Sequence, residues 1–261
     1  LSPEGYKLLL ELANDASSKM RAQILKTYPH ALFGSRNLED YYELRPEAVK
    51  SLSDEDPSVR FIAALAHSGL WSPSSFPLLG ELCVRDMNDP WTVTACALAA
   101  SKLPLQTLTR IIDSDKVSGS APLLSLVEQL ASVLGADRTE PNANQGYYLI
   151  NYLAERSRLD ITALRCLKGL VVGLRRTSTS LQTVAMTAQM PESRVAVWLH
   201  EVGDFVIHEA TSEKAETQTR LMAIMLLPDF LEIAEAIKLM GKNLTPDQPA
   251  ELQAAALESL G

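Results

Sequence analysis

Apolar residues recur along this chain at the three- and four-residue spacing of an α-helix, in short runs rather than in strand-like alternation. In the segment 57–70 one apolar stripe comprises Val59, Ile62, Ala63, Ala66 and Leu70. Phe61 and Leu65 add a second strip, displaced around the same helix axis. A helix that is apolar on two sides needs neighbours on two sides, so the pattern predicts stacked helices.

Start signals divide the chain into short helices. Proline is tolerated in the first helical turn, because its missing N–H group would have no helical partner there. Starts are therefore predicted at the prolines of SPEG, DPSV, SPSS, DPWT, LPLQ, APLL, MPES, LPDF and QPAE. With Ser, Asp and Asn caps, they predict about fourteen or fifteen helices joined by short turns.

One of these units is repeated. The segments 56–70 and 89–103 share seven of fifteen positions, including the Asp-Pro start and the Ala and Leu residues that follow it. A third copy is predicted from Pro249, in QPAELQAAALESLG. Units of about 30 to 45 residues made of two helices are typical of α-solenoids. We therefore expect an α-solenoid in which Ala and Leu form the seam between helices.

Composition agrees with an all-α fold. Hydrophobic residues make up 46% of the 261 residues, aromatic residues make up 6%, and there are only 12 glycines. The one clear interruption is GADRTEPNANQG at 135–146, which is rich in turn-forming residues. It predicts two helical blocks, 1–135 and 146–261, separated by an irregular linker at 136–145 and stacked as one solenoid.

The repeated segment resembles HEAT-like (armadillo-like) repeats, whose second helix commonly opens with Asp-Pro-x-Val-Arg before an Ala-rich run. Asp56, Pro57, Val59 and Arg60 match this pattern, whereas the copy at 89 has Val93 in place of the arginine. The match is specific over about 50 residues. Over the remainder of the chain, the resemblance implies a right-handed superhelix of HEAT-like helix pairs.

More narrowly, RDMNDPWTVTACALAAS at 85–101 resembles the helical region of large bacterial membrane-bound dehydrogenase-like proteins. In that family a propeller domain precedes the HEAT-like repeats and a cytochrome c type haem domain follows them. The resemblance implies a non-catalytic scaffold or docking region on the exported or periplasmic side. Its partners would be proteins or neighbouring domains of the same polypeptide. The sequence has no propeller strands and no CxxCH motif, so no cofactor or catalytic residue is expected in this chain.

Other sequence properties limit the partners and the compartment. The formal net charge of −8 argues against a polyanion such as DNA as the main partner. No run of 18 apolar residues occurs, so no membrane insertion is expected. The first thirty residues lack a signal-peptide layout. Because the chain begins at Leu1 and ends at Gly261 just after a predicted helix, we expect it to be a piece of a longer protein. The oligomeric state is left open.

The strongest candidate for chemistry is WLHEVGDFVIHE at 198–209. His200, Asp204 and His208 are spaced by four residues, so a helix would place them along one face. Two His-Glu pairs also occur in HEAT-like diiron hydroxylases, but there they come from separate repeats that face each other. Here they share one helix over about 12 Å and cannot close around one ion. We therefore expect a solvated polar face and no metal.

A basic stretch is the second candidate. Six basic residues and one acid, Asp160, lie between positions 156 and 176: Arg156, Arg158, Arg165, Lys168, Arg175 and Arg176. A solvated helix face is the favoured interpretation, and docking of an acidic protein is the next. Binding of nucleic acid, as in HEAT-like DNA glycosylases, is disfavoured because the stretch has no aromatic residue for base stacking. An enzyme built on the repeats, either such a glycosylase or a metal-dependent hydroxylase, is thus the disfavoured alternative.

Several other residues have structural interpretations. Cys83, Cys96 and Cys166 are expected to be buried thiols, with a single disulfide left open. TSTS at 177–180 is expected to cap a helix that begins near Leu181. His30 and His67 are expected to be structural. Trp71 and Trp91 are expected to pack over repeat junctions, and the alternative is that they are exposed anchors for a partner.

Overall fold

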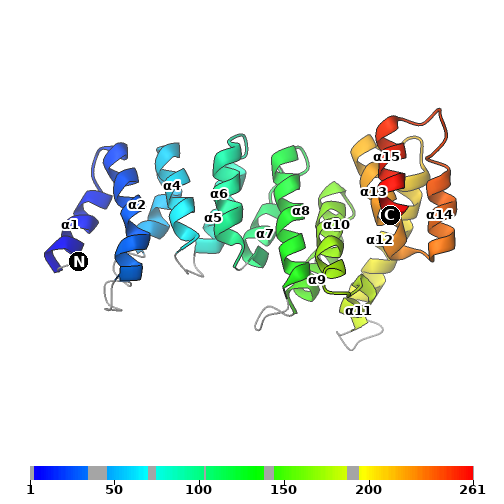
Figure 1. The fold of residues 1–261 in the computed structure, drawn as a ribbon, viewed down its shortest axis with the longest axis horizontal. Helices are drawn as coiled ribbons and strands as arrows, with labels where there is room; N and C mark the ends of the chain where they lie inside the picture. Colours follow the sequence, from blue (N-terminus) through cyan, green and yellow to red (C-terminus); the bar gives the residue numbers. More distant parts are fainter. Residues whose placement is uncertain are drawn as a thin grey trace. The chain divides into compact units, whose positions relative to one another are not determined.

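The computed structural model describes residues 3–34, 46–69, 75–102, 104–137, 144–186 and 194–260, and within these ranges the chain forms helices joined by turns, with no strand (Figure 1). The all-α prediction is therefore confirmed. No helix in the described ranges is both long enough and apolar enough to span a bilayer.

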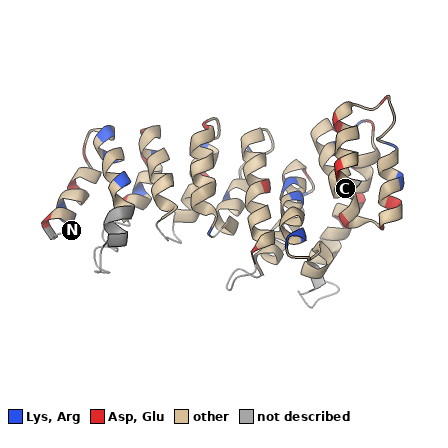
Figure 2. Cartoon of the chain, viewed as in Figure 1, with Lys and Arg blue, Asp and Glu red and all other residues tan. Residues whose placement is uncertain are grey.

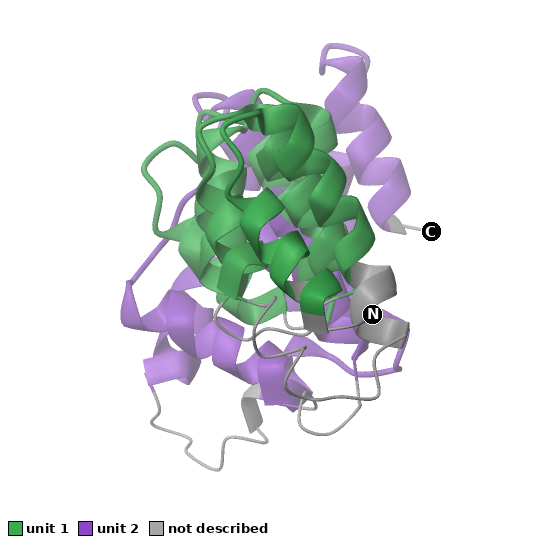
Figure 3. Cartoon of the chain, turned by 90° about the vertical axis from the view of Figure 1, so that its left-hand side faces the viewer, with its two compact units in different colours: residues 1–126 green, residues 127–261 purple. Residues whose placement is uncertain are grey.

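Contacts divide the chain into two compact units, Leu1–Leu126 and Val127–Gly261, which are coloured separately in Figure 3. The division falls inside helix α8 (Ala121–Ala136). The linker expected at 136–145 lies between the end of α8 and the start of the next helix at Gln145, and residues 138–143 are outside the described ranges. The linker therefore stays a prediction.

The first unit contains two sets of packed helices. Its elements are α1 (Pro3–Ala13), α2 (Ser18–Gly34), the 3-10 turn η1 (Ser51–Ser53), α4 (Pro57–His67), α5 (Ser75–Arg85), α6 (Pro90–Ala100), α7 (Pro104–Ile112) and the beginning of α8. Helices α2, α4 and α6 pack against one another in succession, and α5 packs against α7 (Figure 1). This succession buries the first apolar stripe of α4, because Val59, Ala63 and Ala66 are all in the core.

The predicted start signals act as caps. The Asp56 carboxylate accepts a hydrogen bond from the backbone N–H of Ser58, and Asp89 accepts one from Trp91, each with proline in the first helical turn. One predicted start is wrong. The proline of LPDF, Pro228, lies inside α13 and two residues before its end, so it marks a helix terminus and not a beginning.

Arginines at one helix position explain how successive helix pairs are held together. Arg21 forms two hydrogen bonds of 2.8 Å with the Asp54 carboxylate, which lies just before the next helix of its layer. Its remaining Nη donates to the backbone carbonyl oxygens of Asp15 and Ala16. Arg21 thus holds both the turn before its own helix and the turn before the next one.

Arg60 forms the same arrangement one helix pair later, in the same compact unit. It donates two hydrogen bonds, of 2.8 and 2.7 Å, to the Asp86 carboxylate, and two more to the carbonyl oxygens of Asp54 and Glu55. In α6 the equivalent residue is Val93, which has no polar group to continue the series. The role of the arginine in the repeat is therefore to clamp one helix pair to the next.

In its described residues, the second unit contains the remainder of α8 and seven further helices. They are α9 (Gln145–Glu155), α10 (Ile161–Arg175), α11 (Leu181–Met186), α12 (Arg194–Thr211), α13 (Thr217–Phe230), α14 (Ile233–Gly241) and α15 (Ala250–Leu260). Helices α10, α13 and α15 pack in succession, and α12 packs against both α13 and α9. Arg220 occupies the clamp position of α13 and donates to the side chains of Asn243 and Gln248 in the turn before α15.

Helices α8 and α10 approach each other unusually closely. A Cβ atom at Gly169 or Gly173 would clash with the backbone carbonyl oxygen of Glu128 or Ser132, and one at Gly135 would clash with that of Leu170. Glycine is required at these positions because the two backbones are in direct contact.

Candidate functional site

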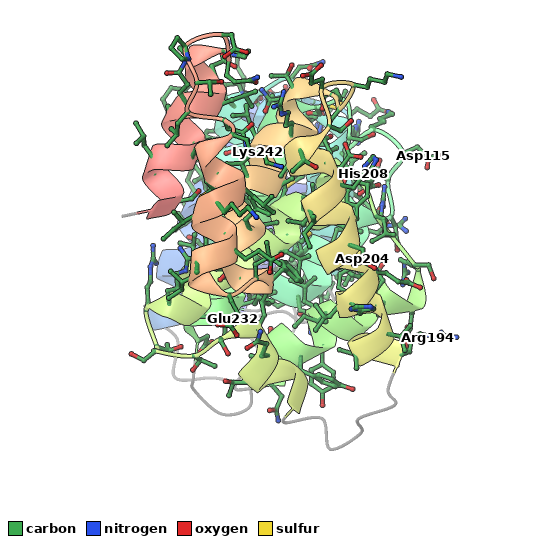
Figure 4. The ribbon with its side chains drawn as sticks, turned by 90° about the vertical axis from the view of Figure 1, so that its right-hand side faces the viewer. Asp115, Arg194, Asp204, His208, Glu232 and Lys242 are labelled. Atoms are coloured by element: carbon green, nitrogen blue, oxygen red, sulfur yellow. The ribbon has the colours of Figure 1, made fainter. Side chains whose placement is uncertain are left out.

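His200, Asp204 and His208 follow one another along α12, and Figure 4 labels the last two. The side chains of His200 and Asp204 are 84% and 72% exposed, with 3.9 Å between His200 Nε2 and Asp204 Oδ2. His208 Nδ1 lies 3.0 Å from Glu209 Oε1 on the same helix. Across the described ranges, no group of three His, Cys, Asp or Glu side chains is arranged to hold a metal ion.

A hollow of about 330 Å³ lies beside these residues, lined by Leu181, Gln182, Leu199, His200, Gly203, Asp204, Ile207, Asp229, Phe230 and Leu231. Burial raises the pKa of Asp229, and the Arg175 guanidinium, whose Nη2 atom lies 3.0 Å from its carboxylate, opposes that shift. The one partly buried acid of the hollow is thus already paired, and the His-Asp pair at the rim is solvated. This arrangement offers a shallow apolar recess and no positioned acid–base pair.

The basic stretch 156–176 is largely used inside the second unit. Arg165 and Lys168 both bind Glu128 of α8, at 2.7 and 2.8 Å, over the point where α8 and α10 meet. Burial acts to raise the pKa of Glu128, but hydrogen bonds from Lys168 and Arg165 together hold it below its ordinary value. Arg175 binds Asp229 of α13. These cations therefore join helices, and little of their charge remains for a partner.

Two other arginines of the stretch also have local partners. Arg158 binds the cap residue Asp160 at 2.6 Å, and the Arg156 guanidinium lies 3.5 Å from the centre of the Tyr152 ring. Arg165, Lys168 and Arg175 lie on α10, as the helical spacing predicted, whereas Arg156 and Arg158 lie in the turn between α9 and α10. The sequence pattern could not show that Arg165 and Arg175 meet acids 37 and 54 positions away in the chain.

The remaining sequence candidates are mostly structural. The backbone N–H of Thr183 donates to Ser180 Oγ at the start of α11, which confirms the cap predicted in TSTS. The three cysteines are buried and unbridged, as expected for structural thiols, so the disulfide left open does not form. His67 is buried, with Nδ1 2.7 Å from the carbonyl oxygen of Ala63. The side chain of His30 and all of Trp71 lie outside the described residues.

Trp91 corrects one expectation. Its side chain does not pack over a junction, because 74% of its surface is exposed at the start of α6. Leu98, two turns further along the same helix, is 56% exposed, and the equivalent residue of α4, Leu65, is 36% exposed. The second apolar strip predicted for the repeat is therefore only partly covered.

These residues lie on two adjacent helices, and Leu65 and Leu98 occupy equivalent positions in them. We define the α4–α6 face as Phe61, Ile62 and Leu65 of α4 with Trp91, Thr94 and Leu98 of α6. Phe61 and Ile62 are half-buried, Thr94 is exposed, and none of the six side chains is charged. Exposed apolar surface gathered on neighbouring helices, with aromatic and aliphatic side chains together, is typical of protein-binding sites.

The charge around this face differs from that of the chain as a whole. Helices α2, α4 and α6 contain 17, 11 and 11 residues, and none of these is Asp or Glu. The chain has 32 acidic residues among 261, so the average composition would place about five in these helices. Figure 2 shows basic residues on α2, and α4 carries the buried Arg60.

Lys19 and Lys26 provide the positive charge beside the α4–α6 face. Both are exposed on α2, which packs against α4, and they are two helical turns apart. Within the described part of the chain, neither ammonium group forms an ion pair. By contrast, the guanidinium of Arg21, on the same helix, is fully used by Asp54 and the carbonyl oxygens of its turn.

Sequence comparisons add no functional assignment: no protein-family model matches the chain, and no significant relative is found among curated proteins.

Proposed function

We propose that this chain is a HEAT-like α-solenoid region that acts as a non-catalytic docking scaffold within a larger redox protein. The α4–α6 face is the part that contacts a protein partner or a neighbouring domain of the same polypeptide. The observation that carries the proposal is the exposure of Trp91 and Leu98 on a helix that has no charged residue. A surface helix of a globular protein ordinarily has charged and polar residues on its outer side, whereas Thr94 is the one exposed polar side chain of α6.

The repeated arginine clamp supports the solenoid part of the proposal. Arg21 and Arg60 occupy the same position relative to their helix starts and bind the same two kinds of group. A repeated contact between neighbouring units is what a stack of helix pairs needs, since each unit can bury its apolar sides only against the next. Such stacks present long surfaces made of equivalent helix positions, and the α4–α6 face is a surface of this kind.

The redox parent rests on the resemblance of the segment 85–101 to dehydrogenase-like proteins. The complete gene product tests this part directly. We expect propeller strands before the present sequence and a CxxCH haem motif after it. If the complete protein contains neither, the link to a redox parent is wrong, while the docking function of the α4–α6 face remains to be judged on its own evidence.

Site-specific photocrosslinking tests the docking function. A photoreactive amino acid replaces Thr94, which lies in the α4–α6 face without being one of its apolar anchors, or Gln106, which is exposed on α7 as a matched control. In the parent protein inside its own cells, we expect position 94 to crosslink to one defined protein segment and position 106 not to do so. Leu98→Glu should abolish the product. Equal crosslinking at both positions, or none at position 94, would contradict the docking function.

A further inference from the structure

We propose that the occupant of the α4–α6 face is an acidic amphipathic helix, with its apolar stripe on Trp91 and Leu98 and its acidic edge over Lys19 and Lys26. The inference rests on the proposed docking function and specifies the chemistry of the partner. It is based on three properties of this part of the first unit: the spacing of its exposed apolar residues, the secondary structure of its surface, and the sign of its charge.

The spacing of the anchors fits a helix. Trp91 and Leu98 are seven residues apart on α6, so their Cα atoms are separated by about 10 Å along the helix axis. Leu65 lies at the position of α4 equivalent to Leu98, on the neighbouring helix. A partner helix presents apolar side chains at the same two-turn interval, so its i and i+7 residues can contact both ends of the face.

The surface favours a helix over an extended peptide. Within α4 and α6 the backbone N–H and C=O groups are used in helical hydrogen bonds, and the described ranges contain no strand with an open edge. A peptide that binds in extended form gains much of its affinity from main-chain hydrogen bonds to such an edge. A helix satisfies its own backbone and binds through side chains, which is what this face offers.

The charge selects an acidic partner. Lys19 and Lys26 form a basic edge on α2, and none of the residues within α2, α4 and α6 is acidic. The nearby acids Asp56 and Asp89 are the caps of α4 and α6, and their carboxylates accept hydrogen bonds from first-turn N–H groups. The two lysines are seven residues apart, the same interval as the apolar anchors. Opposite charges at the rim of an apolar interface mainly accelerate association and exclude partners of the wrong sign. A helix with Glu or Asp along one edge is therefore favoured over a basic one.

Two designed peptides of about 18 residues test this inference. They share one leucine stripe and differ only in the flanking residues, which are Glu in one peptide and Lys in the other. Binding to the full chain is measured by fluorescence anisotropy of the labelled peptide at low salt. Burial of the exposed indole should shift the tryptophan emission to shorter wavelength, and Trp91→Phe identifies the residue responsible.

We expect the acidic peptide to bind at least about tenfold more tightly than the basic one, with the preference decreasing at high salt. The double variant Lys19→Glu/Lys26→Glu should reverse the preference. The matched control Lys7→Glu/Lys116→Glu changes the net charge of the chain equally, at exposed lysines away from the face, and should retain the preference. Leu98→Glu and the milder Leu98→Ser should weaken both peptides, with circular dichroism used to verify the fold.

Four results would overturn the inference. The first is equal binding of the two peptides or preference for the basic one, and the second is a preference that Lys19→Glu/Lys26→Glu leaves unchanged. The third is binding of phosphatidylglycerol vesicles that Leu98→Glu abolishes, which would assign the face to an anionic membrane. The fourth is self-association that the same substitution abolishes, since residues 194–260 carry eleven acidic and five basic side chains and a second copy could supply the acids. If position 94 crosslinks to a protein but the acidic peptide shows no advantage, only the partner chemistry is wrong.

Discussion

Removal of the Arg60 side chain is the most direct test of the clamp between helix pairs. The Arg60 and Asp86 side chains are only 7% and 10% exposed. Arg60→Ala deletes two charged hydrogen bonds to Asp86 and two to the carbonyl oxygens of Asp54 and Glu55. It leaves the Asp86 carboxylate largely buried without its cation. Breaking a buried ion pair in this way costs about 3–5 kcal/mol of unfolding free energy.

The same unit offers a matched control. Arg110 binds Glu81 at 2.9 Å, but these side chains are 51% and 47% exposed, so water can solvate Glu81 when the arginine is removed. Arg110→Ala should therefore cost no more than about 1 kcal/mol. The two substitutions remove the same side chain from ion pairs of nearly equal length, and they differ in the burial of the pair.

Urea denaturation followed by circular dichroism measures both losses. Asp86→Asn and the double variant complete a thermodynamic cycle, in which the coupling between Arg60 and Asp86 should exceed that between Arg110 and Glu81. If Arg60→Ala destabilises the chain by no more than Arg110→Ala, the buried clamp does not hold the first unit together. The reasoning from burial to stability would then be refuted.

Three further predictions concern other parts of the fold. Gly169→Ala should lower the unfolding free energy by about 1–3 kcal/mol, because the added methyl group would push α10 away from α8. Gly241 has open space around it, so Gly241→Ala should be neutral or slightly stabilising. Urea denaturation compares the two variants. The hydrogen bond from Arg21 lowers the pKa of Asp54, so the contribution of the Asp54 carboxylate to stability is present above its unfolded-state pKa and is lost as the pH falls through its folded-state pKa. Asp54→Asn should therefore reduce the decrease in urea midpoint between about pH 5 and pH 2. An unchanged decrease would contradict this prediction. Burial raises the pKa of Cys166, and all three thiols are buried, so a thiol reagent at neutral pH should label them only in urea, and rapid labelling of the native chain would contradict their burial.

The repeat could be recognised in the sequence because its signals are local. A cap residue acts on the N–H groups of the next turn, so Asp56 and Asp89 could be assigned as helix starts from their own neighbourhoods. Pro228 shows the limit of this reasoning, since proline is compatible with the first turn of a helix and also with a helix about to end. Whether α13 ends two residues after Pro228 or begins there depends on how the neighbouring residues pack, which the proline alone does not indicate.

The sequence left two interpretations open for the residues of the α4–α6 face. The second apolar strip of the repeat and the tryptophan at its start were consistent both with a covered junction and with an exposed anchor. Periodicity states that two sides of a helix are apolar, but it does not state that a neighbour covers each side. The sequence also shows that α2, α4 and α6 contain no acidic residue. These helices form one surface without acidic helix residues only because they pack in succession, which the structure shows.

The sequence by itself determined the all-α class, most helix starts, the repeated unit and the burial of the cysteines. Each of these depends on residues close together in the chain or on composition. Only the tertiary structure decided that Arg60 binds Asp86, that the cations of α10 bind Glu128 and Asp229, and that Trp91 is exposed. Ion pairing and solvent exposure depend on which distant helices become neighbours, and a helical pattern does not encode that choice.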